Sequence, residues 1–300
     1  MDNRILNGDE INLRELFKSL SHKKITVTLI IFLFTSIFAV YSLFLPNIYT
    51  SSAIVKMTKE NQGSNFLSQY EGIASLAGVN IPSQLDSVLS PEYVSELIKS
   101  RSFLNRIISK SDIMPGIFAA QSFDINNQKI IYSNAYDSNK NQWNKSYLEG
   151  KSSPSLLDVH KKFIKNNLEI DIDPKTDFIT LRVSHVSPIF AKYLLTQIID
   201  EVNLQEKQKA QEKATLLIAF LQEQLKKINY AALKDSFNSV LERQIETLMF
   251  SEVISDYLIE VIDAPFVPEE KSAPSRLLIA LIGSILGLVF SIFYVLARKD

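Results

Sequence analysis

Two uncharged apolar runs stand out in the pattern of hydrophobic and polar positions. They cover residues 25–45 and 277–297. Each is long enough to cross a hydrocarbon core of roughly 30 Å as a helix. A cleaved signal peptide is the alternative for the first run, but the run exceeds the usual apolar core of about 7–15 residues, and no small-residue cleavage pattern follows before Pro46. We therefore predict two transmembrane helices.

Basic residues flank the two runs on the same predicted side of the membrane. They are Arg4, Arg14, Lys18, Lys23 and Lys24 before the first run, and Arg298 and Lys299 after the second. Because basic flanks stay cytoplasmic, both termini are expected in the cytoplasm. The predicted segments are a cytoplasmic 1–24, transmembrane helices 25–45 and 277–297, an outer domain 46–276 and a cytoplasmic tail 298–300.

The outer domain contains runs in which apolar residues alternate with polar ones. Residues 49–57 alternate directly after the first apolar run and predict a strand leaving the membrane. Residues 168–172 and 179–185 alternate on either side of Asp173-Pro-Lys-Thr-Asp177, which predicts a β-hairpin. A last strand is expected over 257–263.

Ser-Pro pairs mark three expected helix starts, at 90–91, 153–154 and 187–188, since Ser caps free amides and Pro suits the first helical position. The third pair opens a long helix, about 188–228, which would reach about 60 Å. Its stretch 205–213 has only Ala210 as an apolar residue, so we expect it to project into solvent or face a neighbouring subunit. A return helix is predicted over about 231–256.

Two other stretches lack a sustained period. Residues 121–153, crowded with Asn, Ser, Gln, Lys and Tyr, are interpreted as a solvated, irregular region. Residues 60–90 favour a packed loop with a small helical turn around Gly72 to Gly78.

The composition excludes several kinds of binding partner and site. The chain has 32 Lys+Arg against 33 Asp+Glu and no cysteine. An even charge balance gives no broad attraction to nucleic acid, so nucleic acid is not an expected partner. Without cysteine there is no disulfide framework, no thiolate zinc site and no cysteine nucleophile.

Known catalytic motifs are missing from the sequence. It has no phosphate-binding Gly-rich loop ending in Lys-Ser/Thr, no Gly-x-Ser-x-Gly and no His-Glu-x-x-His. His22, His160 and His185 are dispersed, which favours packing or solvation over metal binding. Asp171 and Asp173 are a candidate carboxylate pair for a divalent cation, as in some sugar-nucleotide transferases, but their strand and turn context favours a structural role. We expect no catalytic, cofactor-binding or metal-binding residues.

Gly283 and Gly287 form a Gly-x-x-x-Gly within the second apolar run. Two interpretations are equally favoured. The glycines permit close transmembrane helix packing against a partner helix, or they are a chance pair of small residues.

Taken together, these parts resemble the polysaccharide co-polymerases, specifically the Wzz-type O-antigen chain-length determinants of the Gram-negative inner membrane. The resemblance rests on Pro46-Asn-Ile-Tyr49 after the first apolar run, on the strand and helix around Ser187-Pro188, and on Val261-Ile-Asp-Ala-Pro265 with Pro268 and Pro274 before the second run. Its implied fold class is an α+β periplasmic domain, a membrane-proximal α/β base plus a long protruding helix, between two transmembrane helices.

The resemblance also implies a function. The expected role is a non-enzymatic, homo-oligomeric regulator that sets the modal length of lipopolysaccharide O-antigen, a lipid-linked polysaccharide made by a Wzy-type polymerase. The alternative is a capsule or exopolysaccharide co-polymerase that acts with a separate kinase or transporter. Because only three residues follow the second apolar run, no fused cytoplasmic kinase is expected.

Two further functions, those of a periplasmic sensor and of an enzyme, are less favoured. A periplasmic sensor would share the two-span layout but needs a signalling domain, which the short predicted cytoplasmic segments do not supply. An enzyme that uses Asp171 and Asp173 would lose activity in Asp→Asn variants while keeping its fold.

Overall fold

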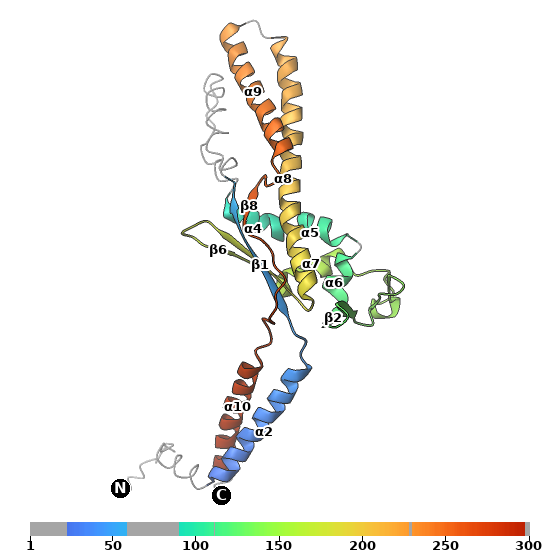
Figure 1. Ribbon diagram of the computed structural model, residues 1–300, viewed down its shortest axis with the longest axis vertical. Helices are drawn as coiled ribbons and strands as arrows, with labels where there is room; N and C mark the ends of the chain where they lie inside the picture. The colour runs from blue at the N-terminus through green and yellow to red at the C-terminus, as the bar shows by residue number, and fades with distance from the viewer. Residues whose placement is uncertain (1–22, 59–89, 111, 228–229, 298–300) are drawn as a thin grey trace, which may run out of the picture. The chain divides into compact units, whose positions relative to one another are not determined.

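The computed structural model describes residues 23–58, 90–110, 112–227 and 230–297 (Figure 1). They fall into two compact units, residues 1–47 with 271–300, and residues 48–270. The predicted cytoplasmic segment up to residue 22, most of the predicted loop 60–90 and the tail 298–300 lie outside the described residues.

The first unit is built on two apolar helices, α2 (Lys24–Phe44) and α10 (Arg276–Ala297). Both are long and apolar enough to cross a membrane. They pack against each other in antiparallel directions, since Phe34 contacts Phe290 whereas Thr35 contacts Ser284. Most of their large apolar side chains are exposed, as expected for surfaces that meet lipid.

The second unit has a four-stranded sheet with the strand order β6-β7-β1-β8. Its strands are β6 (Leu168–Ile172), β7 (Ile179–His185), β1 (Tyr49–Met57) and β8 (Ile259–Asp263). Every neighbouring pair is antiparallel. The predicted hairpin is confirmed as β6–β7, and the predicted strands at 49–57 and 257–263 are confirmed as β1 and β8.

Strict alternation gives the sheet one buried and one polar face. On the buried face, Ala53 lies opposite Leu181 and Val55 lies opposite Ile179, all of them excluded from solvent. Cross-strand polar pairs occupy the other face. They are Thr50 with Ser184 at 2.8 Å, Lys56 with Glu260 at 3.1 Å and Arg182 with Glu169 at 3.2 Å.

Short amphipathic helices complete the core beside this sheet. They are α4 (Pro91–Lys99), α5 (Arg101–Ile108), α6 (Ile113–Ala119) and α7 (Leu156–Asn166). The predicted start at Ser90-Pro91 is confirmed, because the Ser90 side chain accepts from the Tyr93 amide. The predicted start at Ser153-Pro154 is wrong. Ser155 caps α7 instead, accepting from the Asp158 amide, and Pro154 lies before the helix.

The long helix is confirmed as α8 (Pro188–Leu225), and the return helix is α9 (Ala231–Val253). The first part of α8 packs on β1 and β7, and the second part runs beside α9 (Figure 1). The side chain of Asn203 connects α8 to the start of β8. Its amide donates to the Ile259 carbonyl at 2.9 Å, and its oxygen accepts the Leu258 and Ile259 amides.

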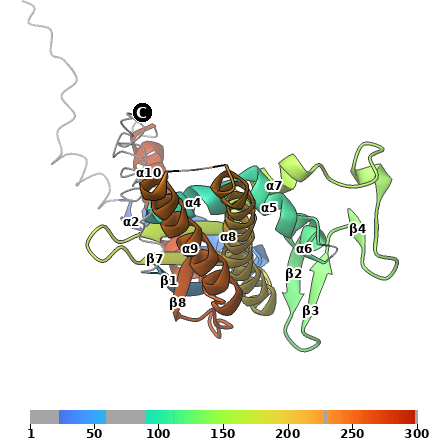
Figure 2. The ribbon, with the colours of Figure 1, turned by 90° about the horizontal axis from the view of Figure 1, so that it is seen from above.

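Residues 121–153 are ordered, which corrects the prediction of an irregular region. They form two small hairpins and a 3-10 turn, which lie beside α6 (Figure 2). The elements are β2 (Ala120–Asp124), β3 (Lys129–Tyr132), β4 (Tyr136–Asp137), β5 (Gln142–Trp143) and η3 (Lys145–Tyr147). Such short strands do not carry enough alternation to be recognised from the sequence.

Candidate functional site

The two glycines of α10 lie where that helix meets α2. A Cβ atom added at Gly283 would come within 2.7 Å of the Phe38 Cβ, and one added at Gly287 within 2.9 Å of the Ile31 Cα. Both distances are too short for a real Cβ. Of the two sequence interpretations, the structure therefore favours close packing, and the helix that these glycines meet is α2 of the same chain.

A hydroxyl pair accompanies the glycines at this contact. The Thr35 and Ser284 hydroxyl oxygens lie 2.8 Å apart, and each also lies within hydrogen-bond distance of a carbonyl one turn earlier in its own helix. Since each hydroxyl has one proton, one of them donates across the contact while the other donates within its own helix. Polar contacts between apolar helices stabilise their association, because lipid offers these groups no partner.

The residues that carry the family resemblance lie in the segments that follow α2 and precede α10. Tyr49 begins β1 and is buried, whereas Pro46 is exposed. Pro268 is buried and Pro265 is half-buried, and between them the Phe266 carbonyl accepts the Ser51 hydroxyl at 2.7 Å. Pro274 follows a cis peptide bond. The structural role expected of these five residues stays a prediction.

The two carboxylates considered as a cation pair have different places: Asp171 lies within β6, opposite Thr180, and Asp173 lies at the β6–β7 turn. Asp173 accepts the Lys175 amide at 2.9 Å and the Thr176 hydroxyl at 2.8 Å. These hydrogen bonds lower the pKa of its carboxyl group. The side chain is therefore engaged in closing the turn. Within the described ranges, no group of three His, Asp or Glu side chains is arranged to hold a metal ion.

The described histidines are packed in the core. The ring of His160 lies 3.0 Å from the Lys99 carbonyl. His185 has its Nε2 at 2.9 Å from the Gly116 carbonyl and its Nδ1 at 3.0 Å from the Ser187 amide. The second contact requires an unprotonated Nδ1, and burial lowers the pKa of His185 to about 4. His22 lies outside the described residues.

The α8–α9 pair presents a second candidate surface. Buried side chains are dense in the first half of α8 but include only Ala214 and Leu221 beyond Gln205. Large apolar residues are exposed along the rest of the pair, including Leu216 and Phe220 on α8 and Met249 and Val253 on α9. Exposed apolar surface of this kind is typical of contacts between proteins.

A charged cluster ties the first half of α8 to α4 and α5. Glu201 is almost buried and faces Arg106 at 3.2 Å and Lys110 at 4.0 Å. The Tyr93 hydroxyl donates to Glu206 at 3.2 Å. Burial and the nearby Glu206 carboxylate raise the pKa of Tyr93. These pairs connect α8 to α4 and α5.

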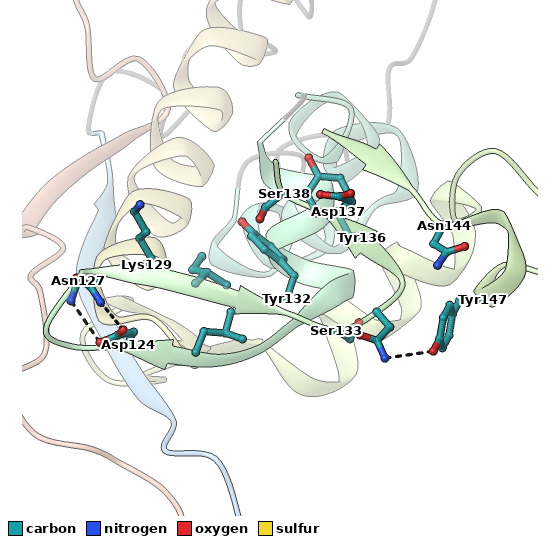
Figure 3. A pocket seen from close by; sticks show the side chains of 13 residues that line it. Asp124, Asn127, Lys129, Tyr132, Ser133, Tyr136, Asp137, Ser138, Asn144 and Tyr147 are labelled. Atoms are coloured by element: carbon teal, nitrogen blue, oxygen red, sulfur yellow. Dashed lines mark hydrogen bonds between the residues drawn. The ribbon is translucent and has the colours of Figure 1, made fainter. Parts of the chain in front are cut away.

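A cavity of about 870 Å³ lies over the two small hairpins (Figure 3). Its lining is mostly aromatic and polar. The lining residues are Asp124, Asn127, Lys129, Ile130, Ile131, Tyr132, Ser133, Asn134, Tyr136, Asp137, Ser138, Asn144 and Tyr147. Asp124 and Asn127 lie at one end, and Asn144 and Tyr147 at the other (Figure 3).

Two aspartates shape this cavity by closing its hairpin turns in the same way. Asp124 accepts the amides two and three residues later, at 3.0 and 3.3 Å, and Asp137 does the same at 3.0 and 3.3 Å. In each turn the fourth residue after the aspartate, Gln128 or Asn141, has a positive φ. Hydrogen bonds from Asn127 lower the pKa of Asp124.

Sequence reasoning missed the cavity, although one signal was present. The aspartates followed by Asn-rich residues are turn formers, and the tyrosines between them are unusual for a solvated loop. The three tyrosines come from β3, β4 and η3, so only the folded chain brings them to one cavity.

Comparisons with known proteins agree with the sequence resemblance. The family model described as Wzz, chain length determinant protein, matches residues 9–111. The Wzz-type resemblance is thus confirmed for the N-terminal part of the chain, which includes Pro46 and Tyr49. No curated protein matches this sequence closely enough to count as a relative.

The solved structures that match this chain include three co-polymerase structures. A full-length bacterial polysaccharide co-polymerase is 14% identical, with 96% of this chain and 97% of that chain covered and a TM-score of 0.41. A fragment of WzzB from Salmonella Typhimurium is 17% identical, with 76% and 100% covered and a TM-score of 0.31. A point mutant of the Shigella flexneri lipopolysaccharide O-antigen chain-length regulator WzzBSF is 14% identical, with 75% and 100% covered and a TM-score of 0.22.

Proposed function

We propose that this chain, whose residues 9–111 match the Wzz chain length determinant model, regulates the length of a bacterial polysaccharide without catalysing a reaction. The specific product is lipopolysaccharide O-antigen, and the working partner is a Wzy-type polymerase that extends a lipid-linked polysaccharide. The family match is the observation that carries this proposal.

The architecture supports the proposal. Two helices that can span a membrane, α2 and α10, enclose an α+β domain in the sequence. In the proposed arrangement both termini are cytoplasmic, and residues 46–276 lie in the periplasm, where O-antigen is polymerised. This arrangement places the domain on the same side of the inner membrane as the growing polymer.

The chemistry of the described side chains is consistent with a regulator. Asp173 closes a turn, His185 is held by backbone groups, and Glu201 is paired with Arg106. Each of these groups has a structural task. The proposed mechanism therefore relies on binding and assembly, in which copies of the chain form a homo-oligomer that acts beside the polymerase.

The test is the length distribution of the polysaccharide on a silver-stained gel. A strain without this gene is compared with the same strain carrying either the gene or the empty vector. We expect the modal band to disappear in the deletion and to return only with the gene. An unchanged ladder would contradict the O-antigen proposal, and the size of the secreted polymer would then show whether capsule or exopolysaccharide is the regulated product.

A further inference from the structure

The cavity over the β2–β3 and β4–β5 hairpins has the volume of a ligand site. Its volume of about 870 Å³ falls within the range of roughly 300–1,000 Å³ that is typical of small-molecule pockets. Three tyrosines line it, together with three asparagines and two serines.

The lining has the chemistry of a saccharide site. Aromatic faces carry negative electrostatic potential and attract the weakly positive C–H groups of a sugar ring. Asparagine amides offer both donors and acceptors, which suits sugar hydroxyl groups. Tyr147 is 58% exposed, so its ring is available at the surface of the cavity.

The charges at the cavity favour an uncharged ligand. Asp124, Asp137 and Lys129 line it, and Asp137 also pairs with Lys140 at 3.9 Å, so two anions are balanced by two cations. Both carboxylates accept backbone amides of their turns. Because these charges cancel, the cavity offers no net attraction to a charged polymer and suits a neutral sugar.

The aromatic groups are held in place before any ligand binds. The side-chain amide of Asn134 donates to the Tyr147 hydroxyl at 3.1 Å, and the Tyr136 hydroxyl donates to Asn141 at 3.2 Å. Tyr132 packs on Tyr136 with ring centroids 5.2 Å apart, and Tyr136 packs on Trp143 at 4.9 Å. Such preorganisation reduces the entropy lost on binding.

The same aromatic chain connects the cavity to the base. Trp143 contacts Phe118 of α6 edge-on, with centroids 6.0 Å apart, and the Ser133 amide donates to the Ala119 carbonyl at 2.8 Å. The cavity is therefore connected through direct contacts to α6, one of the helices beside the sheet.

We propose that this cavity binds an uncharged segment of the polysaccharide, with Tyr147 as the stacking platform and with Asn134 and Asn144 contributing amide hydrogen bonds. The inference rests on the proposed function, because it makes the regulated polymer a direct ligand of the periplasmic domain. Binding at this position would let the regulator sense the growing chain apart from its contact with the polymerase.

The test is equilibrium dialysis of the full-length protein in detergent micelles. The probe is the tritium-labelled polysaccharide released by mild acid from cells that express the protein. We expect saturable binding that is the same at low and high sodium chloride, since the ligand segment is uncharged. Trp143 is the only tryptophan of the chain, so its emission gives a second readout beside the cavity.

The variants separate stacking from general damage. Tyr147→Ala should weaken binding by about tenfold, because it removes the exposed ring. Tyr147→Phe keeps the ring and should bind within a few-fold of the wild type. Tyr230→Ala is the matched control, because Tyr230 is an even more exposed tyrosine that lies outside the cavity, before α9, and it should bind as the wild type does.

Three results would overturn the inference. They are no saturable binding to the wild type, equal binding by Tyr147→Ala and wild type, and binding that falls steeply with salt. None of them touches the deletion experiment, which tests length regulation in cells and does not depend on this cavity. Failure of the inference is therefore distinguishable from failure of the proposed function.

Discussion

Gly287 is the residue at which α10 comes against the backbone of α2. A side chain there would press on the Ile31 Cα at 2.9 Å, and backbone cannot rotate away as a side chain can. At Gly283 the first contact is the Phe38 Cβ, so both glycines are needed for the close approach. The packing of the two helices thus depends on the absence of side chains at two positions.

We predict that Gly287→Leu separates α2 from α10. The chain has no native cysteine, so Thr35→Cys with Ser284→Cys gives one defined thiol pair at a contact of 2.8 Å. A short thiol crosslinker should join the two helices in this background and join them far less in the Gly287→Leu chain. Proteolysis of the outer domain, followed by a gel, detects the linked fragments.

Two controls sharpen this prediction. Ile285→Phe adds bulk at an exposed position of α10 and should leave crosslinking unchanged. A mixture of two chains, one with Thr35→Cys and the other with Ser284→Cys, detects crosslinks between different copies. Equal crosslinking with Leu at position 287 would show that the glycine is not required. In cells, Leu at both 283 and 287 should disturb polysaccharide length without unfolding the outer domain.

His185 predicts a dependence of stability on pH. Its pKa is about 4 in the folded protein against an ordinary value of 6.5, because burial disfavours the charged ring. The unfolded chain therefore binds a proton between these values and the folded chain does not. Stability is fully present above about pH 6.5 and falls as the pH drops towards about 4, by up to about 3 kcal/mol from this residue.

Urea unfolding followed by Trp143 emission measures this effect. His185→Gln cannot titrate, so its free energy of unfolding should fall less between pH 7 and pH 4.5 than that of the wild type. The comparison is made within each protein, so a lower stability of the variant at pH 7 does not affect it. Equal acid sensitivity of the two proteins would show that His185 does not carry the effect.

At the scale of elements, α8 is one helix with two environments. Its first part is buried against the sheet, where Phe190, Leu194 and Ile198 face the core. Within the described ranges, its second part packs mainly on α9 and has few buried side chains. The free energy of local opening increases with the number of buried contacts. The first half of α8 should therefore be more stable than the second, although the helix is continuous.

We predict that backbone amides of residues 207–225 exchange with deuterium at least about tenfold faster than those of residues 194–203. The measurement is exchange followed by mass spectrometry on protein diluted in detergent until it is monomeric. Equal protection of both halves in the monomer would contradict the prediction. Added protection of residues 207–225 in the assembled protein would identify the α8–α9 pair as a subunit contact.

At the scale of the whole molecule, the exposed apolar side chains of α8 and α9 favour assembly of several copies. Leu216 is 71% exposed and Phe220 is 54% exposed, and they lie four residues apart, on one face of α8. On the surface of a monomer these two side chains would lower its solubility and would add little to its own packing.

We predict that Leu216→Lys with Phe220→Lys reduces the oligomer to smaller species and leaves the fold intact. Charged side chains at a desolvated contact are costly, whereas they are tolerated on an exposed helix surface. Light scattering after size-exclusion chromatography gives the mass, and circular dichroism checks the helices. Gln222→Lys, at an exposed polar position of α8, is the control. An unchanged mass in the double variant would place the contact elsewhere.

The sequence by itself determined the elements that carry a long or regular pattern. The apolar runs, the alternation of β1, β6 and β7, and the long helix after Ser187-Pro188 follow from local chemistry, and the structure has them with nearly the predicted bounds. The turn at Asp173 was predicted because Pro174 marks it. The family resemblance followed from short motifs around the same elements.

Only the tertiary structure decided what depends on distant residues. The turns at Asp124 and Asp137 share with the turn at Asp173 the hydrogen bond from the amide two residues later. They have no proline, and their strands are too short to show a period. The sequence did not show which helix Gly283 and Gly287 contact, and the structure shows that it is α2. The cavity requires tyrosines from separate elements to converge, and periodicity reports the face of one element, not the place where several elements meet.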